Sequence, residues 1–160
     1  AVYKTKKFIT DKYFLMLLPD DLIIKNNCSK SMILVHKKFK TSVMASMKIN
    51  KNDVSRWGIY NIKKKIDKDN FIINNVVEKP SIKTSPSNNA VIGRYILPKT
   101  IFSKLRLLKP VKSGEFHITD AIQALIDDDH QFIGHNFSGK YLDCGTMKGY
   151  IKSTLEISKQ

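Results

Sequence analysis

The amino-acid sequence predicts a mixed α/β fold in a single unit, with a sheet flanked by helices. Apolar runs typical of strands alternate along the chain with segments of helical spacing, which is the pattern of such folds. No repeat, linker or low-complexity block divides the 160 residues, a length that suits one ordinary domain with a real core. The first run, residues 13–18, is apolar throughout and therefore indicates a strand covered on both faces, as in a parallel sheet.

The other elements follow from the spacing of apolar residues. Pro98 suits the first turn of one helix, and Thr119 or Asp120 is available to cap another. A polar turn at residues 63–70 separates two short β-like runs, which indicates a hairpin-like pair. Strands are expected at residues 13–18, 41–49, 58–62, 71–77, 90–97 and within 131–142. Helices are expected at residues 31–39, 98–108, 118–126 and 148–159.

Composition excludes several classes of protein. No apolar stretch approaches the roughly 20 residues that span a bilayer, and the first residues lack the apolar core of a signal peptide. Cys28 and Cys144 are too few for a disulfide framework and lack metal-ligand spacing, so reduced thiols are expected. We therefore expect a cytoplasmic protein with no membrane partner.

The formal net charge of +14 raises the alternative of a nucleic-acid binder. Arginine, which carries the planar fork favoured for base and phosphate recognition, occurs only at Arg56, Arg94 and Arg106. The lysines are scattered and lack the aromatic residues of a single-strand binding platform. A solvated lysine face is therefore the favoured interpretation, and nucleic-acid binding is a distant third hypothesis.

Carboxylates follow the first apolar run directly. Asp20 and Asp21 stand after Pro19, where the carboxyl end of a strand meets the ligand crevice of an open α/β sheet. Mg²⁺ commonly takes one or two protein carboxylates and completes its shell with water and phosphates. The alternative is that either aspartate caps the next turn or helix.

Three further strand ends carry unusual residues. Glu78 and Lys79 follow an apolar run, where a carboxylate could accept hydrogen bonds from sugar hydroxyls and an ammonium could neutralise a phosphate. Gly58 could let a backbone approach a ligand closely. Asp143 could be a second metal ligand. The alternatives are a surface pair for Glu78 and Lys79, a plain turn residue for Gly58 and a helix cap for Asp143.

Taken together, these motifs resemble one family over residues 1–150. The chain is similar to the central and C-terminal part of bacterial UTP:glucose-1-phosphate uridylyltransferases, within the wider sugar-nucleotide pyrophosphorylases. The resemblance rests on six motifs in order, at residues 14–22, 57–59, 77–80, 86–95, 114–122 and 143–150. It implies a partial Rossmann-like nucleotidyltransferase fold, with residues 1–160 forming one unit of that domain.

The resemblance also implies roles for individual residues. Asp20 and Asp143 would bind Mg²⁺, and Asp21 would not be a ligand. Lys79 would act on the sugar phosphate, and Glu78 would bind glucose hydroxyls. Three further positions would line or support the sugar pocket beside the Gly58 backbone: Asn88, Gly93 and Tyr95. Three positions near a helix start would be scaffold residues: Glu115, Thr119 and Asp120.

The reaction implied is attack of a glucose 1-phosphate oxygen on the α-phosphorus of UTP, giving UDP-glucose and pyrophosphate. UTP, glucose 1-phosphate and UDP-glucose are then the small-molecule partners, and the family implies a homo-oligomer. The attacking oxygen is already ionised at neutral pH, so no general base is required. This fits the four histidines, which show no ligand-like or triad-like spacing.

One departure from the family concerns its glycine-rich loop. Relatives carry a Gly-x-Gly-Thr-Arg loop that holds nucleotide phosphates and base, and none of the seven glycines here forms one. We therefore expect that an N-terminal nucleotide-binding portion is absent, leaving a fragment, a decayed gene product or half of a split enzyme. The second function hypothesis is a non-catalytic sugar-phosphate-binding or interaction module.

Overall fold

The computed structural model describes residues 1–110, 114 and 116–159. In chain order its elements are η1 (Val2–Phe8), β1 (Tyr13–Leu17), β2 (Asp21–Ile24), α1 (Cys28–Phe39), β3 (Ser42–Lys48), η2 (Lys51–Arg56), β4 (Gly58–Lys65), β5 (Asn70–Glu78), β6 (Asn89–Pro98), α2 (Ile101–Leu107), α3 (Ile118–Asp127), β7 (Phe132–Asn136), β8 (Lys140–Asp143) and α4 (Met147–Ile157). The predicted mixture of strands and helices is thus confirmed.

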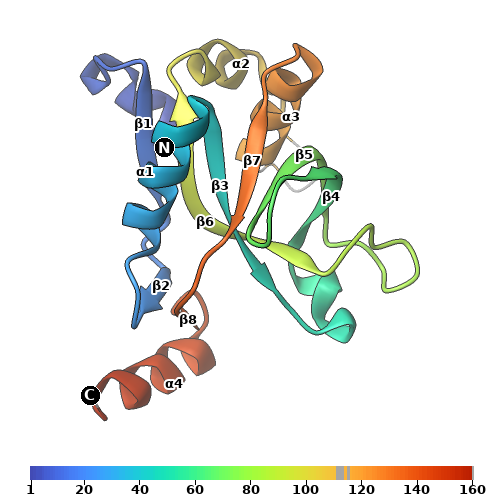
Figure 1. The fold of residues 1–160 in the computed structure, drawn as a ribbon. Coiled ribbons are helices and arrows are strands. Elements are labelled where there is room, and N and C mark those ends of the chain that lie inside the picture. The colour runs from blue at the N-terminus through green and yellow to red at the C-terminus, as the bar shows by residue number, and fades with distance from the viewer. Residues whose placement is uncertain (111–113, 115, 160) are drawn as a thin grey trace.

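A mixed six-stranded sheet forms the centre of the molecule, with strand order β1-β6-β3-β7-β5-β4 (Figure 1). β3 and β7 are parallel, and the other neighbours are antiparallel. The sheet curls back on itself, because β4 also pairs with the beginning of β6 through Ile59 and Ala90. β2 and β8 form a separate antiparallel pair between the main sheet and α4.

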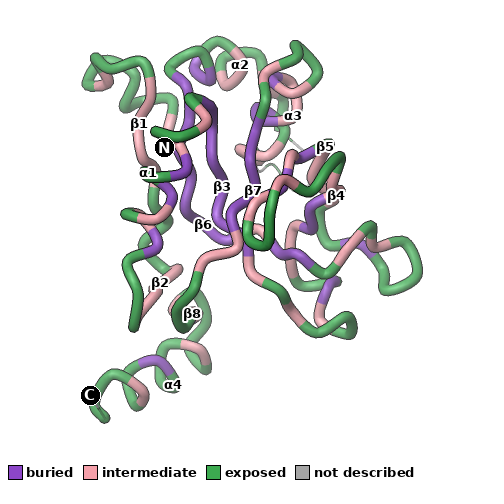
Figure 2. Tube along the Cα trace, in the orientation of Figure 1, coloured by how far each residue is buried: buried purple, intermediate pink, exposed green. Residues whose placement is uncertain are grey.

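Alternation along the strands gives the sheet a core on each face. In β3, Val43 and Ala45 pack with Met32 of α1, whereas Met44 packs on the other face with Phe102 of α2 and Ile122 of α3. Figure 2 shows the resulting buried stretch along β3, β6 and β7. The predicted arrangement, a sheet flanked by helices, follows from this division.

β1 differs from the prediction of a strand covered on both faces of a parallel sheet. It pairs antiparallel with β6 and lies at the edge of the sheet within the described residues. Most of its side chains are half-buried, and Leu17 is 48% exposed. The continuous apolar run therefore reflects packing at an edge, and the parallel-strand prediction is wrong for this strand.

One predicted helix start and one predicted helix cap are also wrong. Pro98 is the last residue of β6, and α2 begins only at Ile101. α3 begins after His117, so Thr119 and Asp120 lie within its first turn and do not cap it. Proline suits both a strand end and a first helical turn, because both tolerate the missing N–H. Glu115 lies outside the described residues.

The hairpin-like pair extends further than the polar turn suggests. β4 continues to Lys65 and β5 begins at Asn70, so half of the predicted turn belongs to strands. Residues 63–65 have exposed side chains, and their polarity is compatible with a strand that faces solvent. β2, η1 and η2 are short elements that the sequence pattern did not predict.

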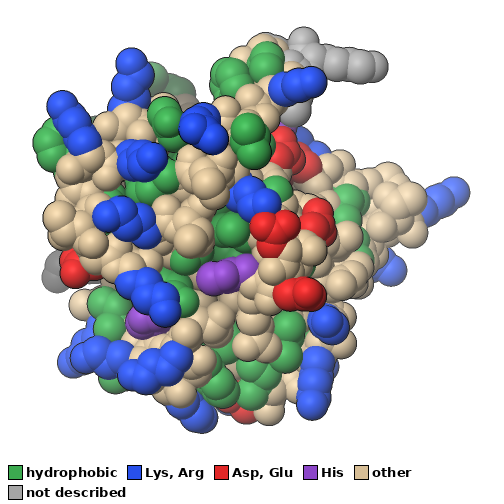
Figure 3. All heavy atoms as spheres, turned by 90° about the horizontal axis from the view of Figure 1, so that it is seen from above, with side chains coloured by type: hydrophobic (Ala, Val, Ile, Leu, Met, Phe, Trp, Pro, Cys, Tyr) green, Lys and Arg blue, Asp and Glu red, His purple; other side chains and the backbone are tan. Residues whose placement is uncertain are grey.

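α4 extends away from the central sheet and ends the chain (Figure 1). Its one buried residue is Ser153, and Figure 2 shows the rest of the helix largely exposed. No helix in the described part of the chain is long and apolar enough to cross a membrane. The face shown in Figure 3 carries its lysine and arginine side chains in scattered positions, as the solvated-lysine interpretation expects.

Candidate active site

Pairing of β2 with β8 brings the first aspartates of the chain to the last one. Asp21 lies opposite Asp143 in this antiparallel pair, and the Cys144 N–H donates to the Asp20 carbonyl at 2.8 Å. Like charges directly opposite each other destabilise a strand pair. The fold therefore holds several carboxylates together at a cost, which is typical of a site that binds a cation.

Asp20 and Asp143 face the same small space above Gly145. A Cβ atom at Gly145 would lie 2.8 Å from Asp20 Oδ2 and 3.4 Å from Asp143 Oδ1. The Gly145 N–H donates to Asp143 Oδ1 at 2.9 Å, which fixes that carboxylate. The described residues include no group of three or more protein ligands for a metal. Two carboxylates fit Mg²⁺, which keeps several waters or phosphate oxygens in its shell.

Asp21 is occupied by bonds within the protein. Its Oδ2 accepts from the Gly93 N–H and its Oδ1 from the Tyr141 hydroxyl, each at 2.5 Å. Asp20, in contrast, is exposed, and its carboxylate has no hydrogen-bond partner in the described part of the chain. The geometry therefore leaves Asp20, and not Asp21, available to a ligand.

Asp20, Asp21 and Asp143 form a carboxylate cluster, and the Tyr141 hydroxyl lies among them. The sequence did not predict a role for Tyr141. Burial raises the pKa of its hydroxyl, and the hydrogen bond to Asp21 and the negative charges of Asp21, Asp143 and Asp20 raise it further. The hydroxyl therefore stays protonated and donates to Asp21. Strand alternation was the available signal, because Tyr141 stands two residues before Asp143 and shares its face of β8.

Glu78 and Lys79 lie at the far end of the hairpin formed by β4 and β5. Gly58 is opposite Glu78, and a Cβ at Gly58 would lie 3.0 Å from Glu78 Oε2. The Lys79 N–H donates to the Trp57 carbonyl at 3.0 Å, and Lys79 has a left-handed backbone with φ of 46°. Both side chains are exposed, and no ion pair joins them within the described chain. The surface-pair alternative is therefore not supported.

The two halves of the site meet through aromatic side chains. The rings of Trp57 and Tyr141 pack edge to face with centroids 5.5 Å apart. Tyr95 is buried, and burial first and then the negative charges of Asp21 and Glu78 raise the pKa of its hydroxyl. The structure thus places the carboxylate cluster and the Glu78–Lys79 corner on one region of the molecule.

Of the remaining predicted positions, Gly93 lies against Asp21, and Asn88 lies two residues before Ala90, which pairs with Ile59 next to Gly58. A Cβ at Gly93 would lie 2.4 Å from Asp21 Oδ2 and 2.6 Å from Leu18 Cβ, so only glycine fits. Asn88 is exposed in the loop before β6, and its side-chain amide donates to the Ile49 carbonyl at 3.2 Å. This bond ties Asn88 to the residue that follows β3.

Arg94 binds the backbone that carries the site, and the sequence did not predict this role either. The side chain is buried, and its guanidinium donates to the carbonyls of Leu18 at 2.9 Å, Gly93 at 3.0 Å and Asp21. These bonds hold the segment that carries Asp20. The signal in the sequence was a cation at an alternate position between Ile92 and Ile96, both of which are buried.

The helix-cap alternatives are wrong for the acidic residues. α1 is capped by Asn27, whose side chain accepts from the Lys30 N–H at 2.9 Å. α4 is capped by Thr146, whose hydroxyl accepts from the Gly149 N–H at 3.1 Å. Asp20, Asp21 and Asp143 cap neither helix.

An α/β fold that holds a pair of carboxylates at the end of a strand defines a broad class of protein. Sequence comparison identifies the family within that class. The chain belongs to the nucleotidyl transferase family, which matches residues 1–160. Among its relatives, the UTP–glucose-1-phosphate uridylyltransferase of Pseudomonas aeruginosa is 34% identical over 157 residues, covering 96% of this chain. The chain spans 56% of the length of that relative.

Solved structures of UDP-glucose pyrophosphorylases share the same fold. An apo structure superposes with a TM-score of 0.92 at 33% identity, covering 99% of this chain and 58% of that chain. A pyrophosphorylase complexed with UDP-glucose gives a TM-score of 0.88 at 33% identity, covering 99% of this chain and 61% of that one. These proteins are what the chain resembles over roughly half their length.

Proposed function

We propose that this chain carries the metal- and sugar-binding side of a site that transfers a uridylyl group from UTP to glucose 1-phosphate, giving UDP-glucose and pyrophosphate. The observation that carries the proposal is the convergence of Asp20 Oδ2 and Asp143 Oδ1 on the space above Gly145. The uridylyltransferase relative and the UDP-glucose complex of a similar protein support it. In this proposal residues 1–160 form one unit of the nucleotidyltransferase domain. The cytoplasm is the compartment that suits a nucleoside triphosphate substrate.

Asp20 and Asp143 would hold Mg²⁺. When bound, this ion supplies charge stabilisation to phosphate oxygens. Asp20 is exposed and therefore accessible to the ion, while Asp143 is held by the Gly145 N–H. Arg94 and the Asp21–Tyr141 bond keep both aspartates in place.

The Glu78–Lys79 corner would bind the acceptor. The Lys79 ammonium would neutralise the phosphate of glucose 1-phosphate and orient its oxygen for in-line attack. Glu78 would accept hydrogen bonds from glucose hydroxyls, and Gly58 leaves space for the sugar to lie against the backbone. The attacking phosphate oxygen is already ionised, so the site needs no proton acceptor.

Calorimetric titration of UDP-glucose into the chain, with Mg²⁺ or with EDTA, tests the binding side of the proposal. We expect binding that is strengthened by Mg²⁺, and we expect Asp20→Asn to remove that gain because one of two carboxylate ligands is lost. Asp11→Asn is the matched control, since it removes an exposed carboxylate before the beginning of β1, whereas Asp20 follows the end of that strand. Equal Mg²⁺ dependence in the parent, Asp20→Asn and Asp11→Asn proteins would refute the metal assignment.

Turnover is tested by pyrophosphate release from UTP and glucose 1-phosphate. The assay compares the chain alone with the chain supplied with a segment that carries a glycine-rich phosphate-binding loop. Turnover that depends on Asp20 and Lys79 in either assay supports the proposal. Saturable binding without turnover in both assays would instead assign a non-catalytic sugar-phosphate-binding role.

A further inference from the structure

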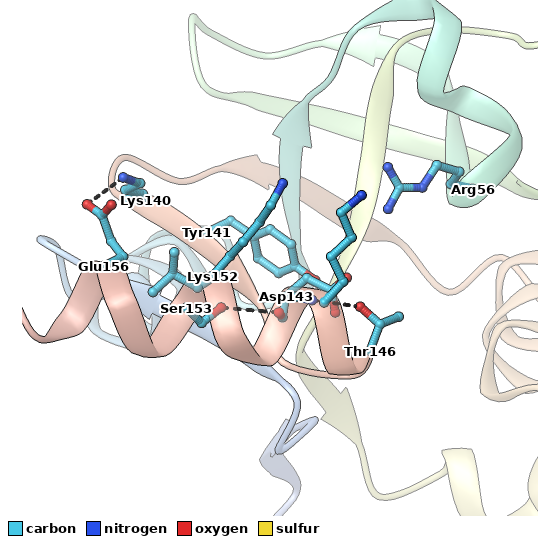
Figure 4. A pocket seen from close by; sticks show the side chains of 11 residues that line it. Arg56, Lys140, Tyr141, Asp143, Thr146, Lys152, Ser153 and Glu156 are labelled. Carbon is cyan, nitrogen blue, oxygen red and sulfur yellow. Dashed lines mark hydrogen bonds and ion pairs between the residues drawn. The ribbon is translucent and has the colours of Figure 1, made fainter.

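A cavity of about 640 Å³ opens beside Asp143, between α4 and the end of η2 (Figure 4). It shares Asp143 with the proposed metal site, but neither Asp20 nor the Glu78–Lys79 corner lines it. Its volume lies in the range of small-molecule sites and exceeds the volume of a single phosphate. The ligand of this cavity is therefore not explained by the metal and sugar contacts proposed above.

Four of the eleven residues that line the cavity are cations, and two, Asp143 and Glu156, are carboxylates. Arg56 enters from η2, and Lys148 and Lys152 enter from α4. The only other cation, Lys140, is already paired with Glu156 at 2.5 Å. Lys148 and Lys152 have no ion-pair partner in the described part of the chain. Arg56 contacts Asp53 only at 4.0 Å, and the two side chains are 65% and 50% exposed, so that contact contributes little.

The two lysines carry a cost that an anion would relieve. Lys148 and Lys152 are four residues apart on α4 and both face the cavity, and like charges at this spacing destabilise a helix. Lys148 lies in the first turn of α4, where a positive charge also opposes the helix dipole. Figure 4 shows Arg56 on one side of the open space and Lys152 on the other. A ligand with several negative charges could contact both sides.

We propose that this cavity is a diphosphate-binding subsite, in which Arg56, Lys148 and Lys152 bind phosphoryl oxygens. The occupant is either free pyrophosphate or the diphosphate of a sugar nucleotide, which share this chemistry. Only the naming of these two sources rests on the proposed function. Asp143 also lines the cavity, but the cations of the proposed subsite form no ion pair with Asp143 or Asp20 in the described part of the chain, so anion binding there does not require Mg²⁺.

Calorimetric titration of pyrophosphate into the chain in EDTA tests the subsite without the metal. We expect the double variant Lys148→Gln/Lys152→Gln to bind pyrophosphate at least about tenfold more weakly, because two charge-assisted hydrogen bonds are lost. The matched control is Lys64→Gln/Lys65→Gln, which removes two exposed charges on β4 and should retain the parent affinity. Arg56→Gln should weaken binding on its own.

Competition with UDP-glucose in EDTA then distinguishes the sources. Displacement of pyrophosphate shows that the cavity accepts the diphosphate of the sugar nucleotide, whereas lack of displacement shows that it is selective for free pyrophosphate. The proposal is overturned if the parent does not bind pyrophosphate, or if the two double variants bind it equally. If a single-stranded oligonucleotide displaces pyrophosphate at a lower concentration than UDP-glucose does, the cavity is assigned to nucleic acid. That result would also overturn the proposal. Because EDTA removes the metal, this titration can succeed even if the metal assignment to Asp20 and Asp143 fails, so failure of the proposed function remains distinguishable.

Discussion

Arg94 is a buried cation that no carboxylate neutralises among the described residues. Its guanidinium is held by the carbonyls of Leu18, Gly93 and Asp21. A buried charge is costly unless it is fully hydrogen-bonded, and a buried carbonyl that loses a charged donor is costly as well. The side chain therefore determines the path of the segment that carries Asp20.

Replacement of Arg94 should destabilise the protein and weaken its metal site together. We expect Arg94→Met to lower the free energy of unfolding by about 2 kcal/mol, because carbonyl oxygens are left without a donor. Arg94→Lys should lose less, since an ammonium can still reach some of them. Urea unfolding measures the change, and Arg106→Met on the exposed surface of α2 is the control. A parent-like Arg94→Met protein would show that the carbonyl bonds contribute nothing net.

Residue positions were predictable where they depended on strand ends. Asp20, Glu78 and Lys79 each follow an apolar run, so their placement could be inferred from the sequence. Tyr141 and Arg94 act through partners more than 70 residues away, as the separations of 120 and 76 residues show. No local pattern specifies such partners, because they are fixed only by strand pairing.

At the scale of elements, α4 is attached to β8 by close backbone contact. A Cβ at Gly149 would lie 2.4 Å from the Asp143 carbonyl and 2.8 Å from Thr146 Oγ1. The Ser153 hydroxyl donates to the same Asp143 carbonyl at 3.1 Å. The first turns of the helix are therefore anchored to the strand end that carries the proposed metal ligand.

Gly149→Ala should reverse the usual effect of this substitution. Alanine normally stabilises a helix interior relative to glycine by about 1 kcal/mol. Here the added methyl group would meet backbone, so we expect a net loss of stability and faster hydrogen exchange in α4 and β8. Thr146→Ala, which removes only the cap, should cost about 1 kcal/mol. A stabilised Gly149→Ala protein would contradict the close packing of α4 on β8.

Elements with a long apolar period were predicted, and short ones were not. The strands over Ser42–Lys48 and Asn89–Pro98 and the helix over Met147–Ile157 agree with the expected positions within a few residues. β2 has only four residues and no clear alternation, yet it positions the aspartates. Its strand conformation follows from pairing with β8, which is more than 100 residues away in the chain.

For the whole molecule, buried histidines link stability to pH. His135 on β7 is buried and joins Asn70 of β5 and Ser31 of α1 through its ring nitrogens, at 2.9 and 3.0 Å. Burial lowers its pKa below 6.5, and the charges of Asp69 and Asp67 oppose this only in part. The unfolded chain therefore takes up a proton before the folded chain does as the pH falls.

Stability should consequently decline as the pH falls below about 6.5, the ordinary histidine pKa. In His135→Gln this contribution is absent, so the variant should be less stable at pH 7.5 but should approach the parent towards pH 5.5. Urea unfolding across that range measures both curves. Parallel curves for parent and variant would exclude His135 as a source of the pH dependence.

The sequence predicted a mixed α/β fold, but it did not predict the pairing of β4 with β6 that closes the sheet on itself. Alternating apolar segments predict strands and helices without stating which strand pairs with which. The parallel prediction for residues 13–18 failed because burial on a sheet edge and burial in a parallel sheet give the same apolar run. The pairing of Ile59 with Ala90, which closes the sheet, leaves no pattern in the sequence.

That closure makes β6 a common frame for both halves of the site. The strand holds the Asp20 segment through Gly93 and Arg94, and it meets the Gly58 end of β4 through Ala90. The carboxylate cluster and the Glu78–Lys79 corner are therefore both attached to β6. They do not move toward each other as separate bodies. Substrate would be accommodated by rotation of the exposed Asp20, Glu78 and Lys79 side chains, with the spacing between metal and sugar set in advance by the register of a single strand.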